Sequence, residues 1–413
     1  MASTTTLNPA RMIAELKELR ALTSDANGAQ RVAWTATWDK ARVWLAEKLA
    51  ALPVELATDE AGNVWATLHG ESDQALLIGG HIDSVPNGGW LDGSLNLLAG
   101  LEVLRRLVTE GTPPVTVRLV DWADEEGARF GRSLFGSSAC AGFMEPAELA
   151  GLHDQAGTLL PTALAAYGVN LWRAKDARRQ LSDAAAYLEL HIEQGPVLED
   201  LGLPLGVVLG TFGVERHTIT FTGQAAHAGS TPMNRRRDAF AAAAKLGLEI
   251  RELAKDYGGV CTVGSCITKP GIVTAVVGEC IITLDQRHME ADPLAAMLRA
   301  AQAAATRYAN EEGCTVAWER LAQIEPIHFH PELIALGEAA IKAVSGSAHR
   351  LPSGPLHDAA EVARAGIPTV MLFVQSLGGI SHNQIEDTHE EHLALAVRAL
   401  DRLATSTIAW LRG

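Results

Sequence analysis

The sequence predicts an α/β protein with a mostly parallel sheet, interrupted by a smaller α+β domain of the ferredoxin-like type. Helix-period segments alternate with strand-like segments up to about Leu209, which is typical of a layered α/β domain. From Val214 the strands become two-sided, and after Pro326 the first style returns. We therefore expect one domain formed by residues 1–211 and 327–413, with residues 212–326 inserted into it as a second domain.

The first part of the chain combines amphipathic periods with short runs of apolar residues. Apolar residues that recur every three or four positions predict helices, and apolar runs bounded by turn residues such as DEAGN predict strands. The expected elements here are helices at residues 8–22, 32–51 and 95–109 and strands at residues 54–57 and 64–68.

The inserted part has a different order of elements. The segments HTITFTG and VVGECIITLDQRH are typical of strands, an alanine-rich helix lies between them, and a second helix and the strand TVAWERL follow. The order strand, helix, two strands, helix, strand is that of a split βαβ domain. The expected helices cover residues 238–255 and 293–310 in this insert, and residues 331–344 and 391–411 on either side of the strand PTVMLFV in the closing segment.

Composition and charge exclude several classes of function. The 413 residues are 47% hydrophobic and carry a net charge of −15, and the longest basic cluster, residues 235–237, has only three members, so nucleic-acid binding is not expected. The N-terminal segment MASTTTLNPARM has no apolar core, and no run approaches the roughly 18 apolar residues of a membrane span. We expect a cytoplasmic protein without membrane contact, whose five cysteines, lacking any CxxC pair, are buried packing residues.

Five potential metal ligands are the most informative polar residues. Most of them stand at the ends of apolar runs, such as ALLIGG, VTVRLVDWADEE and AAYLELHIE, that predict buried strands delivering polar side chains to one edge of a sheet. Three imidazoles and two carboxylates suit Zn, Mn, Co or Ni better than Ca or Mg, and the sequence does not choose among those four metals. The five residues are His81, Asp92, Glu126, His191 and His382.

The segment GGHIDSVPNGGWLDGS carries two of these ligands. His81 and Asp92 lie eleven residues apart across a loop rich in glycine, asparagine and proline, which can fold back so that the two side chains meet. Asp83 lies on the same face as His81 in an extended chain and can hold the imidazole in place. A strand-end histidine and an ordinary helix N-cap at Asp92 are the alternative interpretation of this segment.

Glu125 and Glu126 follow the strand VTVRLVDWAD as a neighbouring pair. Adjacent side chains of an extended segment point in opposite directions, so one carboxylate can bind metal while the other acts as a general base. A solvated acidic strand end is the alternative for this pair, and a structural histidine is the alternative for His191. The common position of these residues at strand exits favours a site.

Longer motifs resemble one enzyme family. The segments GGHIDSVPNGGWLDG, WADEEGARFGRSLFGS, LELHIEQGPVLE, FTGQAAHAGSTPMNRRRDA, LDQRH, LPSGPLHDA and GGISHNQIEDT are similar to those of the hydantoinase/carbamoylase branch of the metal-dependent aminoacylase and carboxypeptidase superfamily. The resemblance implies two divalent ions per subunit, one held by His81 and His191 and the other by Glu126 and His382, with Asp92 shared. It also implies that Glu125 is the general base and that Asp83 orients His81.

The same resemblance implies an activity and a set of substrate contacts. The expected reaction is hydrolysis of a carbamoyl or ureido C–N bond, as in an N-carbamoyl-L-amino acid, giving the amino acid, carbon dioxide and ammonia. The inserted domain would be a lid and would form a homodimer, from which His227 reaches the partner's active site to stabilise the oxyanion. The remaining implied contacts to a small carboxylate-bearing substrate are Gln194, Arg287, His357, Gly378 and Gly379.

The sequence also departs from the family pattern. Thr274 and Val277 stand where the family usually has an asparagine that helps to hold the substrate carboxylate and a proline, and Pro355 and Leu356 replace small residues before His357. The alternative substrates are therefore allantoate, 3-ureidopropionate and N-acyl amino acids. An inactive binding or scaffold homologue is disfavoured, because all five ligands and the general base are present.

Overall fold

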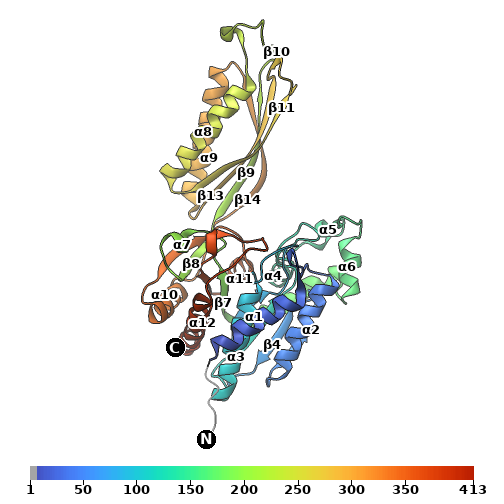
Figure 1. The fold of residues 1–413 in the computed structure, drawn as a ribbon, viewed down its shortest axis with the longest axis vertical. Helices are drawn as coiled ribbons and strands as arrows, with labels where there is room; N and C mark the ends of the chain where they lie inside the picture. Colours follow the sequence, from blue (N-terminus) through green and yellow to red (C-terminus); the bar gives the residue numbers. More distant parts are fainter. Residues whose placement is uncertain (1–6) are drawn as a thin grey trace. The chain divides into compact units, whose positions relative to one another are not determined.

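The computed structural model describes residues 7–413, and the chain separates into two compact units (Figure 1). One unit comprises the chain up to Gly210 together with Phe329–Gly413, and the other comprises Thr211–His328. The part of the N-terminal prediction that concerns residues 1–6 lies outside the described residues. No helix within residues 7–413 is long and apolar enough to cross a membrane.

A mixed sheet forms the centre of the first unit. Its strands β6, β5, β7 and β17 run parallel to one another, and β4 and β8 extend the sheet in antiparallel fashion on the two sides. The neighbours follow the order β8, β17, β7, β5, β6, β4, β3, with β16 beside β8. The strands are β3 (Glu55–Thr58), β4 (Val64–Leu68), β5 (Ala75–His81), β6 (Thr116–Trp122), β7 (Ala184–Ile192), β8 (Leu205–Thr211), β16 (His349–Ser353) and β17 (Thr369–Val374).

The central strands are continuous apolar runs in the sequence because both faces of the sheet are buried. Every residue of β5 and of β17 is buried, and helices α3, α11 and α12 all contact the sheet. The mostly parallel α/β prediction is thereby confirmed. The helices of this unit are α1 (Pro9–Thr23), α2 (Ala36–Ala50), α3 (Ser94–Glu110), α4 (Phe135–Ala141), α5 (Pro146–Leu149), α6 (Leu160–Ala166), α7 (Val197–Asp200), α10 (Pro331–Ser345), α11 (Asp358–Arg364) and α12 (Glu390–Arg412).

Most helix boundaries lie within three residues of the prediction, but the expected start of the second helix at residue 32 is wrong. Helix α2 begins at Ala36, because Thr35 is its N-cap and accepts a hydrogen bond from the Trp38 N–H through its hydroxyl. Trp34 has a φ of 59°, which a helix interior does not allow. The preceding residues instead follow a short hairpin formed by β1 (Ser24–Asp25) and β2 (Gly28–Ala29).

The second unit is a four-stranded antiparallel sheet with the strand order β11, β13, β9, β14. Helices α8 and α9 lie side by side on one face of this sheet (Figure 1). Burial alternates along β13, because Cys280, Ile282 and Leu284 face the helices. The elements are β9 (Gly213–Thr222), β10 (Ala226–His227), α8 (Ala239–Tyr257), β11 (Val260–Lys269), β12 (Ala275–Val276), β13 (Glu279–His288), α9 (Ala291–Glu311), β14 (Thr315–Ile324) and, at the return, β15 (Ile327–His328).

The five cysteines are all unpaired thiols, but they are not all buried. Cys140, Cys280 and Cys314 are buried packing residues as predicted, whereas Cys261 is half-buried and Cys266 is exposed. Cys266 follows a bulge in β11, pairs with Ile282 and has its Sγ 3.6 Å from that of the buried Cys280, yet the residue itself remains exposed.

Candidate metal centre

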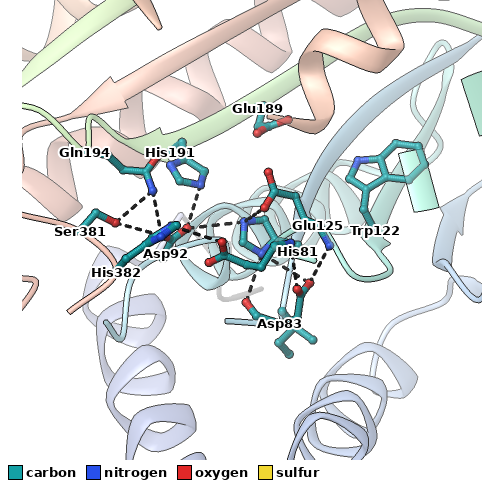
Figure 2. A network of polar contacts seen from close by, with 12 residues as sticks. His81, Asp83, Asp92, Trp122, Glu125, Glu189, His191, Gln194, Ser381 and His382 are labelled. Carbon is teal, nitrogen blue, oxygen red and sulfur yellow. Dashed lines mark hydrogen bonds and ion pairs between the residues drawn. The ribbon is translucent and has the colours of Figure 1, made fainter. Parts of the chain in front are cut away.

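Polar side chains collect at the carboxyl ends of the parallel strands, where ligand sites of open α/β sheets occur. His81 is the last residue of β5, His191 is the next to last of β7, and Asp92 stands two residues before α3. Glu126 follows β6, and His382 follows β17 beyond the turn η3 (Leu377–Gly379). Figure 2 shows His81, Asp92, His191 and His382 pointing toward one another.

Asp92 lies between two groups of potential ligands. Its Oδ1 is 3.2 Å from Nε2 of His191 and 3.6 Å from Nε2 of His81. Its Oδ2 is 3.5 Å from Nε2 of His382, which in turn is 3.2 Å from Oε2 of Glu126. The ligand atoms of each group lie within 4.8 Å of one another, so each group has the compactness that a metal ion requires, and Asp92 belongs to both.

The hydrogen bonds of His81 and His191 use Nδ1 and leave Nε2 of each ring available to bind a metal ion. His81 Nδ1 is 3.1 Å from the backbone oxygen of Asp83, and His191 Nδ1 is 2.9 Å from that of Ile192. A carbonyl oxygen can only accept, so each ring donates from Nδ1 and keeps its Nε2 lone pair for another partner. Both Nε2 atoms are buried without a hydrogen-bond partner, as is Oε1 of Glu126. These buried nitrogen and oxygen atoms offer lone pairs that no hydrogen bond uses, and such a mixed ligand set fits a divalent cation.

The pKa shifts of Asp92 and His382 also support a metal site at these residues. Burial opposes ionisation of Asp92, yet the close imidazole of His191, together with those of His81 and His382, holds the pKa of Asp92 well below its usual range. The hydrogen bond with Glu126 raises the pKa of His382 to about 9. A bound metal ion would add positive charge beside these buried carboxylates.

Asp83 connects the metal ligands to the acidic pair. Its backbone oxygen receives the bond from His81, while its carboxylate lies 3.6 Å from the same ring nitrogen. The two carboxylate oxygens accept the backbone N–H groups of Glu125 and Glu126, each at 3.2 Å. Asp83 therefore fixes the main chain that carries Glu125 and Glu126 as well as the ring of His81.

Glu125 lies beside the two groups without belonging to either. Its Oε2 is 3.7 Å from Nε2 of His81, and only 7% of the residue is exposed. Burial raises the pKa of Glu125 well above its usual value, and the nearby carboxylate of Asp358 adds to this, while His81 opposes it. A carboxylate with a raised pKa is better matched to take and return a proton near neutral pH.

A second set of residues forms hydrogen bonds with the carboxylate and the backbone of Asp92. Gln194 Nε2 donates to Oδ2 of Asp92 at 2.9 Å, and Ser381 Oγ donates to the same oxygen at 3.0 Å. Glu386 accepts the backbone N–H groups of Leu91 and Asp92 at 3.1 Å. Its Oε2 also lies 2.9 Å from Ser381 Oγ, whose single hydrogen can be donated to only one of the two carboxylates at a time. Gln194 was expected to contact substrate; its amide nitrogen is committed to Asp92 and Ser381, while its Oε1 is buried without a partner.

Two of these supporting residues, and the nearby buried Glu189, lie outside the site residues that the sequence predicts. Glu386 and Ser381 stand in the motif SHNQIEDT, where only the histidine was singled out. Glu189, labelled in Figure 2, lies two residues before His191 on the same face of β7. It accepts a hydrogen bond from Tyr187 Oη at 2.7 Å. Its spacing from His191 was the available signal, because alternate residues of a strand share a face.

The backbone at the site is strained in a local pattern. Asp124, Gln194 and His382 have φ values of 57°, 57° and 54°, a region that residues other than glycine rarely adopt. Each of them is a proposed ligand or lies within three residues of one, so strained backbone occurs where the ligand side chains must be oriented. Gly93 has a φ of 65°, and a Cβ atom there would lie 2.3 Å from the His81 ring.

The other proposed substrate residues of the first unit have defined surroundings. The ring of His357 lies 4.3 Å from that of His191 and is buried, and burial lowers its pKa well below the usual value, with His191 adding to the effect. Gly378 donates its N–H to Glu199 at 2.8 Å. A Cβ at Gly379 would lie 2.8 Å from the Pro196 nitrogen, so this glycine allows close approach of the chain to itself.

The remaining candidates belong to the second unit. His227 Nδ1 accepts from the backbone N–H groups of Gly229 and Ser230, both at 3.1 Å, so the ring presents an Nε2–H donor to the exterior. Arg287 is paired with Asp285 through Nε at 2.8 Å. The side chain of Thr274 is exposed, and its carbonyl oxygen accepts from Ala228 at 2.8 Å, beside the ladder of β10 and β12.

Comparisons with known proteins agree with this architecture. The chain matches the pattern of peptidase family M20/M25/M40 over residues 77–406. It is 35% identical over 381 residues to an N-carbamoyl-L-amino acid amidohydrolase of Geobacillus stearothermophilus, covering 91% of this chain and 92% of the relative. It is 34% identical over 390 residues to an allantoate amidohydrolase of Escherichia coli (strain K12), covering 93% and 94%.

Solved structures place the chain more narrowly. A hydantoinase/carbamoylase family amidase from Burkholderia multivorans superposes with a TM-score of 0.88 at 30% sequence identity, covering 97% of this chain and 98% of that chain. The corresponding enzyme from Burkholderia phymatum gives a TM-score of 0.87 at 32% identity, covering 98% and 99%. The chain therefore belongs to peptidase family M20/M25/M40 and, within it, to the hydantoinase/carbamoylase family of amidases.

Proposed function

We propose that this amidase hydrolyses the carbamoyl C–N bond of an N-carbamoyl-L-amino acid, giving the amino acid, carbon dioxide and ammonia. The observation that carries the proposal is that two groups of metal-binding side chains share Asp92 and lie beside Glu125, which belongs to neither group. The relatives named as N-carbamoyl-L-amino acid and allantoate amidohydrolases support a ureido substrate.

The five residues of the two groups are the proposed ligands for the metal on which the family depends. In the proposal, His81 and His191 hold one divalent ion, Glu126 and His382 hold a second, and Asp92 contacts both. Bound ions would supply Lewis acidity to the ureido carbonyl and make a water molecule in the site more acidic. Zn, Mn, Co and Ni all fit this set of nitrogen and oxygen donors.

Glu125 is the proposed general base. Its carboxylate is anchored through the backbone bond to Asp83, lies close to His81 and is shielded from bulk solvent. It takes a proton from the attacking water and passes it to the departing nitrogen. The second transfer matters because an amide nitrogen leaves poorly unless it is protonated.

The second unit supplies two of the proposed substrate contacts. The Nε2–H of His227 is set up to donate to an oxyanion, because two backbone N–H groups occupy the other ring nitrogen. Arg287, held in orientation by Asp285, offers a guanidinium fork to the substrate carboxylate. We further propose that the inserted unit is a lid and a homodimer interface, and that His227 acts on the site of the partner subunit.

Allantoate, 3-ureidopropionate and N-acyl amino acids are the alternative substrates. Thr274 is one reason to retain these alternative substrates. Its exposed hydroxyl offers the substrate carboxylate fewer hydrogen bonds than the asparagine amide that the family usually has there. Pro355 and Leu356 next to the buried His357 also differ from the usual small residues. The proposed contacts of Gln194, His357, Gly378 and Gly379 with substrate are common to all of these alternatives.

The deciding experiment measures ammonia and amine release after metal stripping and refilling. Protein treated with a chelator is expected to lose activity and to regain it with two equivalents of Mn, Co, Ni or Zn. The panel comprises L- and D-N-carbamoyl amino acids, allantoate, 3-ureidopropionate and N-acetyl amino acids. Preference for an L-carbamoyl amino acid supports the proposal, preference for another member selects that alternative, and full activity in metal-free protein contradicts the mechanism.

A mixed-dimer experiment tests whether His227 acts across subunits. His227→Ala and Glu125→Gln are each expected to be nearly inactive, since one lacks the oxyanion donor and the other lacks the base. A dimer with one subunit of each kind has one site that combines an intact Glu125 with the partner's intact His227. Activity should therefore return on mixing, as followed by ammonia release with differently tagged subunits. If tag exchange is complete and no activity returns, His227 does not act in trans.

A further inference from the structure

Arg31 is a fully buried cation with no assigned role. It lies between β2 and α2, and none of its surface is exposed. Its Nε donates to the backbone oxygen of Ile82 at 2.7 Å, its Nη1 approaches Oγ1 of Thr23 at 3.4 Å, and its Nη2 has no hydrogen-bond partner. No carboxylate of residues 7–413 lies within ion-pair distance of it. Burial of an unpaired guanidinium is costly, so its retention requires a compensating function.

The main chain of Arg31 is bonded to the same segment as its side chain. The N–H of Arg31 donates to Ser84 Oγ at 3.1 Å, and the carbonyl oxygen of Arg31 accepts from the Ser84 N–H at 3.1 Å. Together with the bond to Ile82, these contacts hold both neighbours of Asp83. The N–H of Ile82 is separately fixed by Asp121 Oδ1 at 2.9 Å.

The clamped segment is the one on which the metal centre depends. Asp83 receives the hydrogen bond that sets the tautomer of His81, and its carboxylate holds the main chain of Glu125 and Glu126. A shift of residues 82–84 would therefore move a ligand of one proposed ion, a ligand of the other and the proposed base together. No other side chain among the described residues donates to the carbonyl of Ile82.

The charges facing Arg31 explain why a cation can remain in this position. Burial lowers its pKa, and the carboxylates of Glu386, Asp92, Asp83 and Glu126 act in the opposite direction. A guanidinium keeps its proton even when the pKa is lowered. The carboxylate-rich surroundings thus stabilise the charge at a distance, and they leave the planar fork free to bond to the backbone.

We propose that Arg31 is a positioning residue of the metal centre: it clamps residues 82–84 so that His81, Glu125 and Glu126 are aimed before metal binds. This inference rests on the proposed metal-dependent function. It assigns to Arg31 no contact with metal or substrate. The loss of an outer partner that orients metal ligands typically weakens metal binding by about 10- to 100-fold.

The test is a metal titration of Arg31→Met. Mn²⁺ binding to stripped protein is followed by calorimetry, and Co²⁺ binding is followed by its visible absorption spectrum. We expect weaker binding of both ions by about 10- to 100-fold, an altered Co²⁺ spectrum, and a kcat at saturating metal that falls more than KM changes. Removal of a buried positive charge alone would strengthen cation binding, so weaker binding is the signature of lost positioning. Unchanged or tighter binding in folded protein overturns the proposal.

Two further variants keep the test decisive. Arg105→Met removes another part-buried arginine, which lies on α3 and is paired with Glu15 of α1 and Glu102 of α3. It should lower the melting temperature without changing metal affinity. Arg31→Lys retains the charge but loses the fork, and an affinity between those of wild type and Arg31→Met is expected. If Arg31→Met does not fold, weaker binding by Arg31→Lys supports the inference and wild-type binding contradicts it. Absence of metal binding by the wild-type protein would instead contradict the proposed function.

Discussion

Glu125→Gln is expected to lower kcat by about 10²- to 10⁴-fold while the protein retains its metal ions. The amide is nearly the same size as the carboxylate, so the packing around this buried residue is preserved. It cannot accept a proton, however, and the step that activates water and protonates the leaving nitrogen loses its catalyst. KM should change much less, because Glu125 acts in the transition state rather than in uniform binding.

The measurement combines steady-state kinetics with elemental analysis of the same preparation. Glu102→Gln is the matched control, since Glu102 is also a buried glutamate and is paired with Arg11 and Arg105. That change should affect thermal stability and leave kcat close to the wild-type value. A Glu125→Gln protein that keeps most of its kcat would show that another group is the base, and one that loses its ions would show that Glu125 is a ligand.

The sequence could predict where the site lies because strand exits have a local signature. His81 and His191 follow buried apolar runs, and parallel pairing of β5 with β7 then brings them together. The structure directs Glu125 to His81 and Glu126 to His382, as the predicted division of roles requires. The predicted cause is wrong, because β6 ends at Trp122 and the pair lies in a bend beyond it rather than in an extended strand. The split βαβ order of the second unit was equally visible, because its strands alternate in burial.

The supporting contacts could not be predicted, since they depend on pairings between distant segments. Glu386 meets the backbone of Asp92 across 294 positions of sequence, and no periodicity records that contact. Arg31 immediately precedes the helix expected at residues 32–51, outside any predicted element, and no periodicity there marks its side chain as buried. The tautomers of His81 and His191 depend on backbone carbonyl groups, whose direction follows from the folded chain alone.

Asp92→Asn should have the largest effect on metal content, because Asp92 is the one residue common to both ligand groups. The asparagine can keep its oxygen toward Gln194 and Ser381, which donate to Oδ2, and can direct its amide toward His191. The variant is thus expected to fold. It loses the negative charge that both proposed ions share, so the affinity for each should fall by more than the roughly 10- to 100-fold typical of an outer partner.

Comparison with His382→Asn makes this prediction specific. His382 belongs only to the group with Glu126, and its half-exposed ring can be removed with little loss of packing. That variant should therefore release one ion and keep the other, whereas Asp92→Asn should release both. Asp59→Asn alters another buried carboxylate of the same unit, bonded to Asn63 and Trp65, and should leave both ions in place. If Asp92→Asn retained two tightly bound ions by elemental analysis, Asp92 would not be the shared ligand, and the two groups would have to hold metal independently.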